Sequence, residues 1–212
     1  MNDVLRPLLG KIVVVYLDNI VIYTKGSLEQ HVKDVEEVLK LIQKATLQIK
    51  IKKCVFFQEK IHFLGHKISR HGIATDPEKV EAMKNLPTPK NLRDVQSVLG
   101  LFQYYKNFVK DFARIAGPIY LALKKDQFQW GPEQDAAFNT LKQKMTEAPI
   151  LAHPDYDKEF ILYTDASYQG LGFILSQEDE QGKEHPVRYG GRKLRPSKKN
   201  YTITDLECLR IV

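Results

Sequence analysis

Proline sets the firmest local limits on this chain, because its ring fixes the backbone angle φ and removes the amide hydrogen-bond donor. Asp76-Pro77 and Gly131-Pro132 have the form of helix starts, with proline at the first helical position. Pro87-Thr88-Pro89 and Ala148-Pro149 interrupt the chain instead. The helices of the middle third therefore have to begin and end at these prolines. We place a domain boundary at Ala148-Pro149.

The first 75 residues contain two stretches with the composition of β-hairpins. Residues 11–24 form two β-branched and aromatic runs on either side of Asp18-Asn19. Asparagine tolerates positive φ, so a tight turn at this pair is expected. Residues 55–73 are also β-rich, and Gly65 and Gly72 indicate turns or bulges there.

Apolar residues at helical spacing predict the helices. Ser27 is placed to cap one of them, and Val32, Val35, Val38, Leu39 and Ile42 recur along it. The predicted helices cover residues 28 to about 45, a segment that starts at Asp76-Pro77, residues 92–109, residues 111–124, and residues 131 to about 146.

The last segment returns to strands. Residues 160–164 predict a strand that ends in Asp165, residues 170–176 its hairpin partner, and residues 185–190 a third strand. Residues 202–212 have helical character and are still apolar at Val212, which predicts a domain that is cut short. The expected fold class is α+β.

Composition narrows the class of protein. The 212 residues are 43% hydrophobic and 27% charged, which excludes a wholly disordered or collagen-like chain. Cys54 and Cys208 are too few for a disulfide framework, and the longest apolar run, residues 12–17, cannot span a bilayer. We expect no membrane partner and an intracellular, reducing location.

The charge is unevenly distributed. The net charge is +6 and the sequence pI is about 9.1. Residues 1–75 carry 12 basic and 7 acidic side chains, whereas residues 151–212 carry 9 and 10. A basic first part would suit a polyanion such as nucleic acid, although many ordinary domains have a similar pI.

Two groups of residues could bind metal ions. Asp18, at the predicted hairpin turn, is the type of ligand that Mg²⁺ prefers, although Asp-Asn is also simply a good turn pair. The cluster of Cys54 with His62, His66 and His71 matches no standard zinc spacing. Strand alternation predicts His62 and His66 on one face.

Several motifs, in order, resemble the reverse transcriptases of gypsy-class long-terminal-repeat retrotransposons. Residues 13–23 (VVVYLDNIVIY) are similar to the YxDD hairpin of that family, and residues 63–66 (FLGH), 68–69 and 72–73 to its primer-grip hairpin. Residues 76–80 and 99–108 resemble its thumb. Residues 160–167 (FILYTDAS), Tyr189, residues 192–194, residues 200–201 and Glu207 resemble its ribonuclease H domain. The resemblance covers essentially the whole chain.

This resemblance implies a domain order and a chemistry. The expected parts are the C-terminal palm with its β-hairpins and one helix (1–76), a helical thumb or connection (77–149), and a truncated, mixed-sheet RNase H-like domain (150–212). Asp18, Asp165 and Glu207 would be catalytic metal ligands, and Asn19 a weak one, for Mg²⁺ or Mn²⁺ in two-metal phosphoryl transfer. The alternative, purely structural roles are a turn residue at the end of a strand for Asp165 and a solvent-exposed helix position for Glu207.

The resemblance also implies the residues that contact nucleic acid. These are Tyr16 and the primer-grip residues Phe63, Leu64, Gly65, His66 and Lys67, with Lys106 and Lys110 from the thumb. Further basic residues lie nearby in sequence, at Lys50, Lys52, Lys53, Lys60 and Arg114, and each could equally be a solvated surface position. We expect Tyr104 and Tyr105 to belong to the thumb core rather than to stack on bases.

The chain also departs from the family pattern. Asn19 stands where YxDD has its second aspartate, and Asp3, the one acid upstream of Asp18, is not in the family's upstream acidic motif. Two further nuclease acids would lie beyond Val212. We therefore expect a fragment that is inactive alone.

The intact enzyme would use an RNA/DNA hybrid or DNA duplex and deoxynucleoside triphosphates, in the cytoplasm, the nucleus or a virus-like particle. The alternatives are a non-catalytic nucleic-acid-binding module and a subunit that completes an enzyme in trans. The sequence does not predict an oligomeric state.

Overall fold

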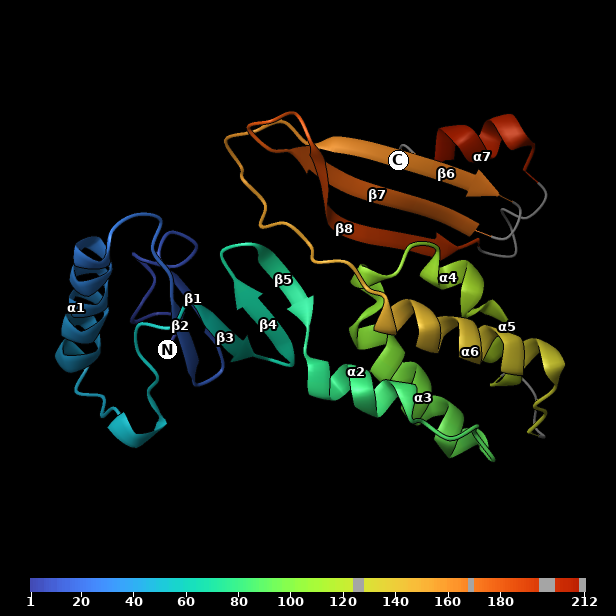
Figure 1. Ribbon diagram of the computed structural model, residues 1–212, viewed down its shortest axis with the longest axis horizontal. Helices are drawn as coiled ribbons and strands as arrows, with labels where there is room; N and C mark the ends of the chain where they lie inside the picture. The colour runs from blue at the N-terminus through green and yellow to red at the C-terminus, as the bar shows by residue number, and fades with distance from the viewer. Residues whose placement is uncertain (124–127, 168–169, 195–200, 210–212) are drawn as a thin grey trace. The chain divides into compact units, whose positions relative to one another are not determined.

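The computed structural model describes residues 1–123, 128–167, 170–194 and 201–209. It confirms the α+β class (Figure 1). The chain divides into two compact units, residues 1–57 and residues 58–212, and each is described by itself.

The first unit begins with a small hairpin. Strands β1 (Val13–Tyr16) and β2 (Asn19–Ile22) are antiparallel, and Tyr16 pairs with Asn19. The turn is therefore Leu17-Asp18, one residue earlier than predicted, and Leu17 rather than Asn19 has positive φ (55°). The pairing of Val13 with Ile22 keeps apolar side chains on one face, and a slip of one residue would expose them.

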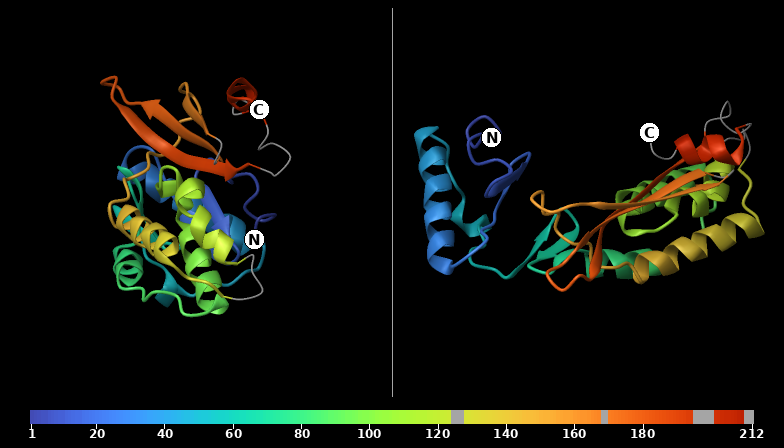
Figure 2. Two further views of the ribbon diagram at one scale, coloured as in Figure 1. Left: turned by 90° about the vertical axis from the view of Figure 1, so that its right-hand side faces the viewer. Right: turned by 90° about the horizontal axis from the view of Figure 1, so that it is seen from above.

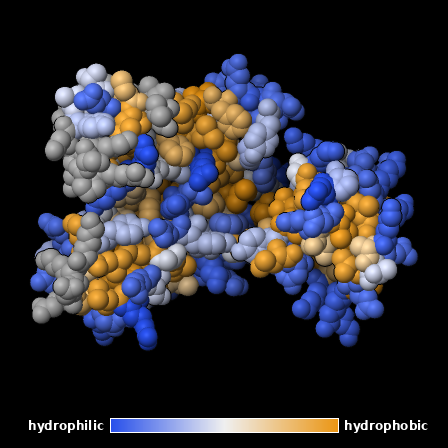
Figure 3. Space-filling model, turned by 180° about the vertical axis from the view of Figure 1, so that it is seen from behind, coloured by the Kyte–Doolittle hydropathy of each residue, from blue (hydrophilic) through white to orange (hydrophobic). Residues whose placement is uncertain are grey.

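Helix α1 (Leu28–Lys44) covers this hairpin, and Ser27 caps it as predicted by accepting a hydrogen bond from the Gln30 amide at 3.3 Å. Val38 and Ile42 are buried against Leu5, Leu8 and Val13. Val32 and Leu39 were predicted on the same apolar face but are exposed. On the face of this unit that Figure 3 shows, apolar and hydrophilic residues are interspersed. A 3₁₀ turn, η1 (Ile51–Lys53), follows.

The second unit begins with a three-stranded antiparallel sheet of β3 (Lys60–Phe63), β4 (His66–Ser69) and β5 (Gly72–Thr75). Phe63 pairs with His66, and His62 pairs with Lys67. Because successive pairs alternate between faces, His62 and His66 lie on opposite faces of the sheet. The expectation of one shared face was wrong, since a tight turn separates the two residues.

Helices follow the sheet, and the starts of α2, α3 and α6 agree with the sequence. They are α2 (Pro77–Lys84), α3 (Leu92–Tyr104), the 3₁₀ turn η2 (Lys106–Phe108), α4 (Phe112–Ile115), α5 (Gly117–Ala122) and α6 (Pro132–Thr146). Asp76 caps α2 by accepting from the Glu78 amide at 3.0 Å. The predicted helix over 92–109 ends at Tyr104. The one over 111–124 begins at Phe112, after the left-handed Asp111 (φ 61°), and is divided at Ala116, because Gly117-Pro118 starts a new helix.

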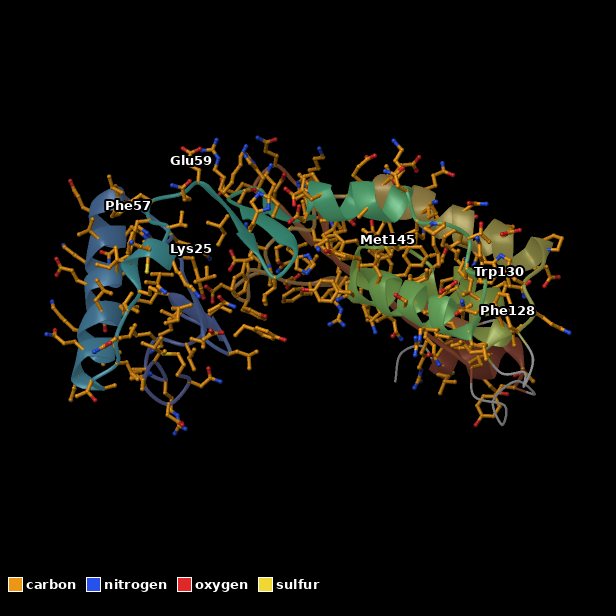
Figure 4. All side chains as sticks on the ribbon, turned by 90° about the horizontal axis from the view of Figure 1, so that it is seen from below. Lys25, Phe57, Glu59, Phe128, Trp130 and Met145 are labelled. Carbon is orange, nitrogen blue, oxygen red and sulfur yellow. The ribbon has the colours of Figure 1, made fainter. Side chains whose placement is uncertain are left out.

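The helices enclose one apolar core. Phe102, Phe138, Leu141 and Met145 are fully buried in it, as the spacing of Leu141 and Met145 predicts. Met145 points into the space between the helices, while Phe128 and Trp130 lie together at the other end of α6 (Figure 4). This core supports α3, which carries Tyr104 and leads directly into Tyr105.

A second antiparallel sheet contains β6 (Ile161–Ser167), β7 (Gly170–Glu178) and β8 (Glu184–Lys193), and α7 (Ile203–Leu209) contacts β6. A parallel pair, which a mixed sheet requires, is not among the described strands. The sheet lies over one side of the helices and contacts α4 and η2 (Figure 2). In the part of the chain that the structure describes, no helix is long and apolar enough to cross a membrane.

The segment between α6 and β6 joins the two sheets of this unit. Ile73 and Leu151 exchange two backbone hydrogen bonds of 2.8 Å, and the Ala152 amide donates to the Pro186 carbonyl at 2.8 Å. Gly72 makes this approach possible, because a Cβ there would lie 2.1 Å from the Leu151 oxygen.

We predict that Gly72→Ala lowers the free energy of unfolding by about 2 kcal/mol or more, because its φ of 128° and the Leu151 carbonyl both oppose a side chain. Gly100→Ala is the control. It lies inside α3 with nothing within 4 Å of the added Cβ, so a gain of roughly 0.5–1 kcal/mol is expected. Urea denaturation measures both, and equal effects would contradict the close contact at Gly72.

Candidate nucleic-acid site

The first candidate group lies at the β1–β2 turn. Tyr16, Asp18 and Asn19 are all exposed, with Tyr16 and Asn19 paired across the hairpin. A carboxylate and an amide oxygen are suitable ligands for Mg²⁺, which is typically held by one or two carboxylates together with phosphate oxygens and water. Among the described residues, however, no group of three or more His, Cys, Asp or Glu side chains could hold a metal ion. Asp18 therefore fits as one ligand of an incomplete set.

The second group surrounds the β3–β4 turn (residues 63–66). Leu64 and Gly65 have positive φ values of 49° and 68°, which make a type I′ turn. The Tyr104 hydroxyl donates to the Leu64 carbonyl, and the Tyr105 hydroxyl donates to the Gly65 carbonyl at 2.8 Å. The backbone amide of Asp76 also donates to Gly65 at 3.2 Å. The turn is thus held from α3 and from the end of β5.

His66 lies in an aromatic cage. Its ring stacks on Tyr104 (centroids 5.3 Å apart, planes at 10°) and on Phe108 (5.5 Å, 24°), and it meets Tyr105 edge-on at 5.4 Å. Its Nδ1 is buried and has no hydrogen-bond partner in the described structure. Burial lowers the pKa of His66, although the charge of Asp76 acts in the opposite direction, so the neutral ring is favoured.

The surroundings of Tyr105 and Asp76 favour the neutral phenol and the charged carboxylate. Burial raises the pKa of Tyr105 to about 12, with smaller contributions from Tyr104 and Asp76, so its hydroxyl stays a donor. A hydrogen bond from His62 (Nδ1 to Oδ2, 3.2 Å) is the main reason why the pKa of Asp76 is lowered. Tyr105 belongs to the core, as predicted, but Tyr104 is 50% exposed.

Three of the predicted cations belong to elements that meet at this turn in the second unit. Lys67 is on β4, and the exposed Lys106 and Lys110 flank Phe108, which stacks on His66. Residues 104–108 thereby meet His66 of the hairpin through aromatic contacts. Arg114 pairs instead with Asp111, at 3.3 Å. Lys50, Lys52 and Lys53 are exposed and belong to the first unit.

The nuclease candidates belong to the second sheet and to the helix that contacts it. Asp165, on β6, pairs with Gly172 and lines a small hollow with Gly191, Asp111 and Arg114. A Cβ at Gly172 would lie 3.4 Å from Asp111 Oδ1, which places the start of α4 against this strand. Glu207 belongs to α7, which contacts β6, but its side chain lies outside the described residues. Sequence reasoning missed Asp111 here, because only long-range packing brings it to Asp165.

Comparison with known proteins agrees with this arrangement. Residues 1–68 match the family model "Reverse transcriptase (RNA-dependent DNA polymerase)", and residues 130–212 match "RNase H-like domain found in reverse transcriptase". The Pol polyproteins of the Drosophila melanogaster transposons 297 and gypsy are 38% and 37% identical to the chain over its whole length. The transposon Tf2-7 polyprotein of Schizosaccharomyces pombe is 34% identical, again over the whole chain. The chain covers 20%, 21% and 16% of these three polyproteins.

Solved structures share the fold. The foamy viral protease–reverse transcriptase in complex with an RNA/DNA hybrid superposes with a TM-score of 0.83 and 22% identity, over 99% of this chain and 28% of that one. A dRH form of the viral protein in complex with double-stranded DNA gives 0.85 and 22%, over 99% and 37%.

The fold and the ordered motifs define a reverse transcriptase with an RNase H-like region. The chain belongs to the reverse transcriptase family of retrotransposon Pol polyproteins and corresponds to about a fifth of the length of these relatives.

We predict that the protein loses stability as the pH falls below about 6.5, the ordinary pKa of histidine, partly through His66. In that range the unfolded chain binds a proton that the caged, folded ring does not bind. His66→Phe keeps the ring contacts and removes the titration, so its stability should depend less steeply on pH between 7.5 and 5.

Urea denaturation across this pH range measures the effect. His71→Phe is the control, because His71 is exposed, and it should keep the pH dependence of the parent chain. If His66→Phe also kept that dependence unchanged, the neutral state of His66 would be disproved.

Proposed function

We propose that this chain is the part of a retrotransposon reverse transcriptase that holds the template-primer, as an RNA/DNA hybrid or a DNA duplex. In this assignment residues 1–76 are the C-terminal palm, 77–149 the thumb or connection, and 150–212 the start of the RNase H-like domain. The observation that carries the proposal is the β3–β4 turn, which is fastened to α3 by two tyrosine hydroxyls. Lys67 follows the turn on β4, and the exposed Lys106 and Lys110 lie two residues before and after Phe108, whose ring stacks on His66. Relatives with the same fold bind duplexes of both kinds.

Most of these contacts would be to phosphate groups. Lysines neutralise phosphates without reading the base sequence, as an enzyme that moves along any template requires. Tyr16 and residues 63–66 would hold the primer strand near its end. These roles, together with an intracellular location in the cytoplasm, nucleus or virus-like particle, follow from the family resemblance.

We assign the metal chemistry to the same residues as the sequence does. Asp18, with Asn19 as a weaker ligand, would hold Mg²⁺ or Mn²⁺ for nucleotide addition from deoxynucleoside triphosphates. Asp165 and Glu207 would do so for RNA cleavage. When bound, the ions would activate the attacking oxygen and stabilise the leaving one. Because the described residues provide an incomplete ligand set, we expect neither reaction from this chain alone.

Duplex binding tests the proposal. We predict that the chain binds a fluorescent RNA/DNA hybrid with an affinity that falls steeply as salt rises, because phosphate contacts release counterions. The double variant K106E/K110E should bind more weakly and lower the slope of log Kd against log salt by roughly two. Fluorescence anisotropy at salt concentrations from about 50 to about 300 mM measures both quantities.

The matched control is K84E/K144E, which makes the same change of charge at two exposed positions on α2 and α6. It should weaken binding less and leave the slope close to that of the parent chain. Binding that does not respond to salt, or equal effects of the two double variants, would overturn the assignment of Lys106 and Lys110.

Metal binding at the β1–β2 turn gives a separate prediction. Asn19→Asp adds a second carboxylate beside Asp18 and should raise the affinity for Mn²⁺ several-fold, because ligand charge sets the affinity for hard cations. The measurement is the Mn²⁺-induced broadening of the amide NMR signals of residues 16–20. Asn2→Asp is the control, since it creates an acidic pair with Asp3 away from the turn, and it should leave these signals as they are.

A further inference from the structure

We propose that Tyr104 and Tyr105 are positioning residues whose two hydroxyls fix the β3–β4 turn to α3 and so determine where this turn meets the primer end. The inference rests on the proposed function, because it takes the turn to contact the strand end. It adds a role for two residues that the sequence assigned only to the thumb core.

The conformation of the turn requires an external hold. Leu64 lies in the left-handed region (φ 49°), which disfavours a branched side chain, and both central residues of the turn have positive φ. Two consecutive carbonyl groups, those of Leu64 and Gly65, accept hydroxyls from two consecutive tyrosines of another element. These long-range contacts stabilise a turn that its own sequence only partly favours.

Gly65 fits this arrangement in space as well as in conformation. A Cβ at this position would lie 2.8 Å from the Tyr105 hydroxyl oxygen, closer than side-chain atoms pack. Tyr105 is fully buried, so its hydroxyl cannot move aside easily. The Gly65 carbonyl also accepts a hydrogen bond from the Asp76 amide, which connects the turn to the start of α2 as well.

His66 makes the hold reciprocal. The residue belongs to β4, yet its ring lies between Tyr104 of α3 and Phe108 of η2. It fixes the plane of the Tyr104 ring, and the two tyrosine rings meet edge-on with centroids 4.9 Å apart. The β3–β4 turn and α3 are therefore expected to move as one rigid body.

The functional consequence concerns the primer end. Because the turn is fastened to α3, this helix also sets the position of a strand end that touches the turn. Lys106 and Lys110, which come shortly after α3, are exposed to solvent. Tyrosine is suited to this role, since its hydroxyl donates to the carbonyl at all pH values near neutrality while the ring packs in the core.

The double variant Y104F/Y105F tests the inference, because it removes both hydroxyls and keeps both rings. Hydrogen exchange of the backbone amides of residues 63–67 should accelerate by about tenfold or more, since the two hydrogen bonds that hold the turn are lost. In the same variant, 2-aminopurine at the recessed 3′ end of a DNA primer on an RNA template should lose most of the fluorescence change that binding produces. The affinity for a blunt hybrid should change less than threefold.

The control is Y163F, which removes a tyrosine hydroxyl that donates to Glu184 at 2.6 Å on the second sheet. It should leave both the exchange rates of residues 63–67 and the 2-aminopurine signal unchanged. If the parent chain does not bind the hybrid, the proposed function is wrong, and hydrogen exchange alone then tests whether the two hydroxyls fix the turn. If the parent chain binds but Y104F/Y105F leaves both readouts unchanged, the positioning role is wrong.

A double-mutant cycle gives an independent test that does not require nucleic acid. Gly65→Ala should raise the unfolding equilibrium constant less in a Y105F background than in the parent, by about fivefold or more, because the oxygen that opposes the new Cβ is absent. Equal effects in the two backgrounds would show that Tyr105 does not constrain the turn. The positive φ of Gly65 contributes equally to both and cancels.

Discussion

The arrangement of the second unit depends on the hydrogen bonds that fasten the β3–β4 turn to the end of α3. The carbonyl groups of two consecutive turn residues accept hydrogen bonds from the hydroxyls of two adjacent tyrosines at the end of α3. Buried or half-buried carbonyls without partners would be costly, so the hairpin and the helix stabilise each other. His66 adds a stacking contact from the hairpin back to Tyr104 of α3. The residues with the clearest resemblance to a primer grip are thus also the residues whose position the helical core controls.

Close backbone approach explains how the other parts of this unit join. Gly72 admits the Leu151 carbonyl, so the segment after α6 pairs with β5, and the neighbouring Ala152 bonds to β8. Gly172 lines a small hollow with Asp111 and Asp165, where α4 contacts the strands. The contact at Gly72 needs a residue without a side chain. A glycine that looks like an ordinary turn or strand residue in the sequence is, in the fold, the place where two elements meet.

Local signals predicted the elements well, and the errors have identifiable causes. The caps at Ser27 and Asp76 were found because a short polar side chain before a helical pattern satisfies free backbone amides. The β1–β2 turn was placed one residue late, because the Asp-Asn pair suggests a turn more strongly than Leu17 does, whereas the pairing of the apolar faces decides the register. The helix over 92–109 ends early, since Tyr105 turns toward Gly65 and the chain continues as η2.

The amino-acid sequence by itself determined the α+β class, the helix starts, the family and the candidate residues Asp18, Asp165 and Glu207, because motifs, caps and periodicity are local properties. Only the tertiary structure decided which residues meet. It separated His62 from His66 across a sheet, buried Tyr105 while leaving Tyr104 half exposed, and brought Asp111 to Asp165. Such contacts join residues that are far apart in the chain, and they form only when the apolar core fixes the path of the backbone between them.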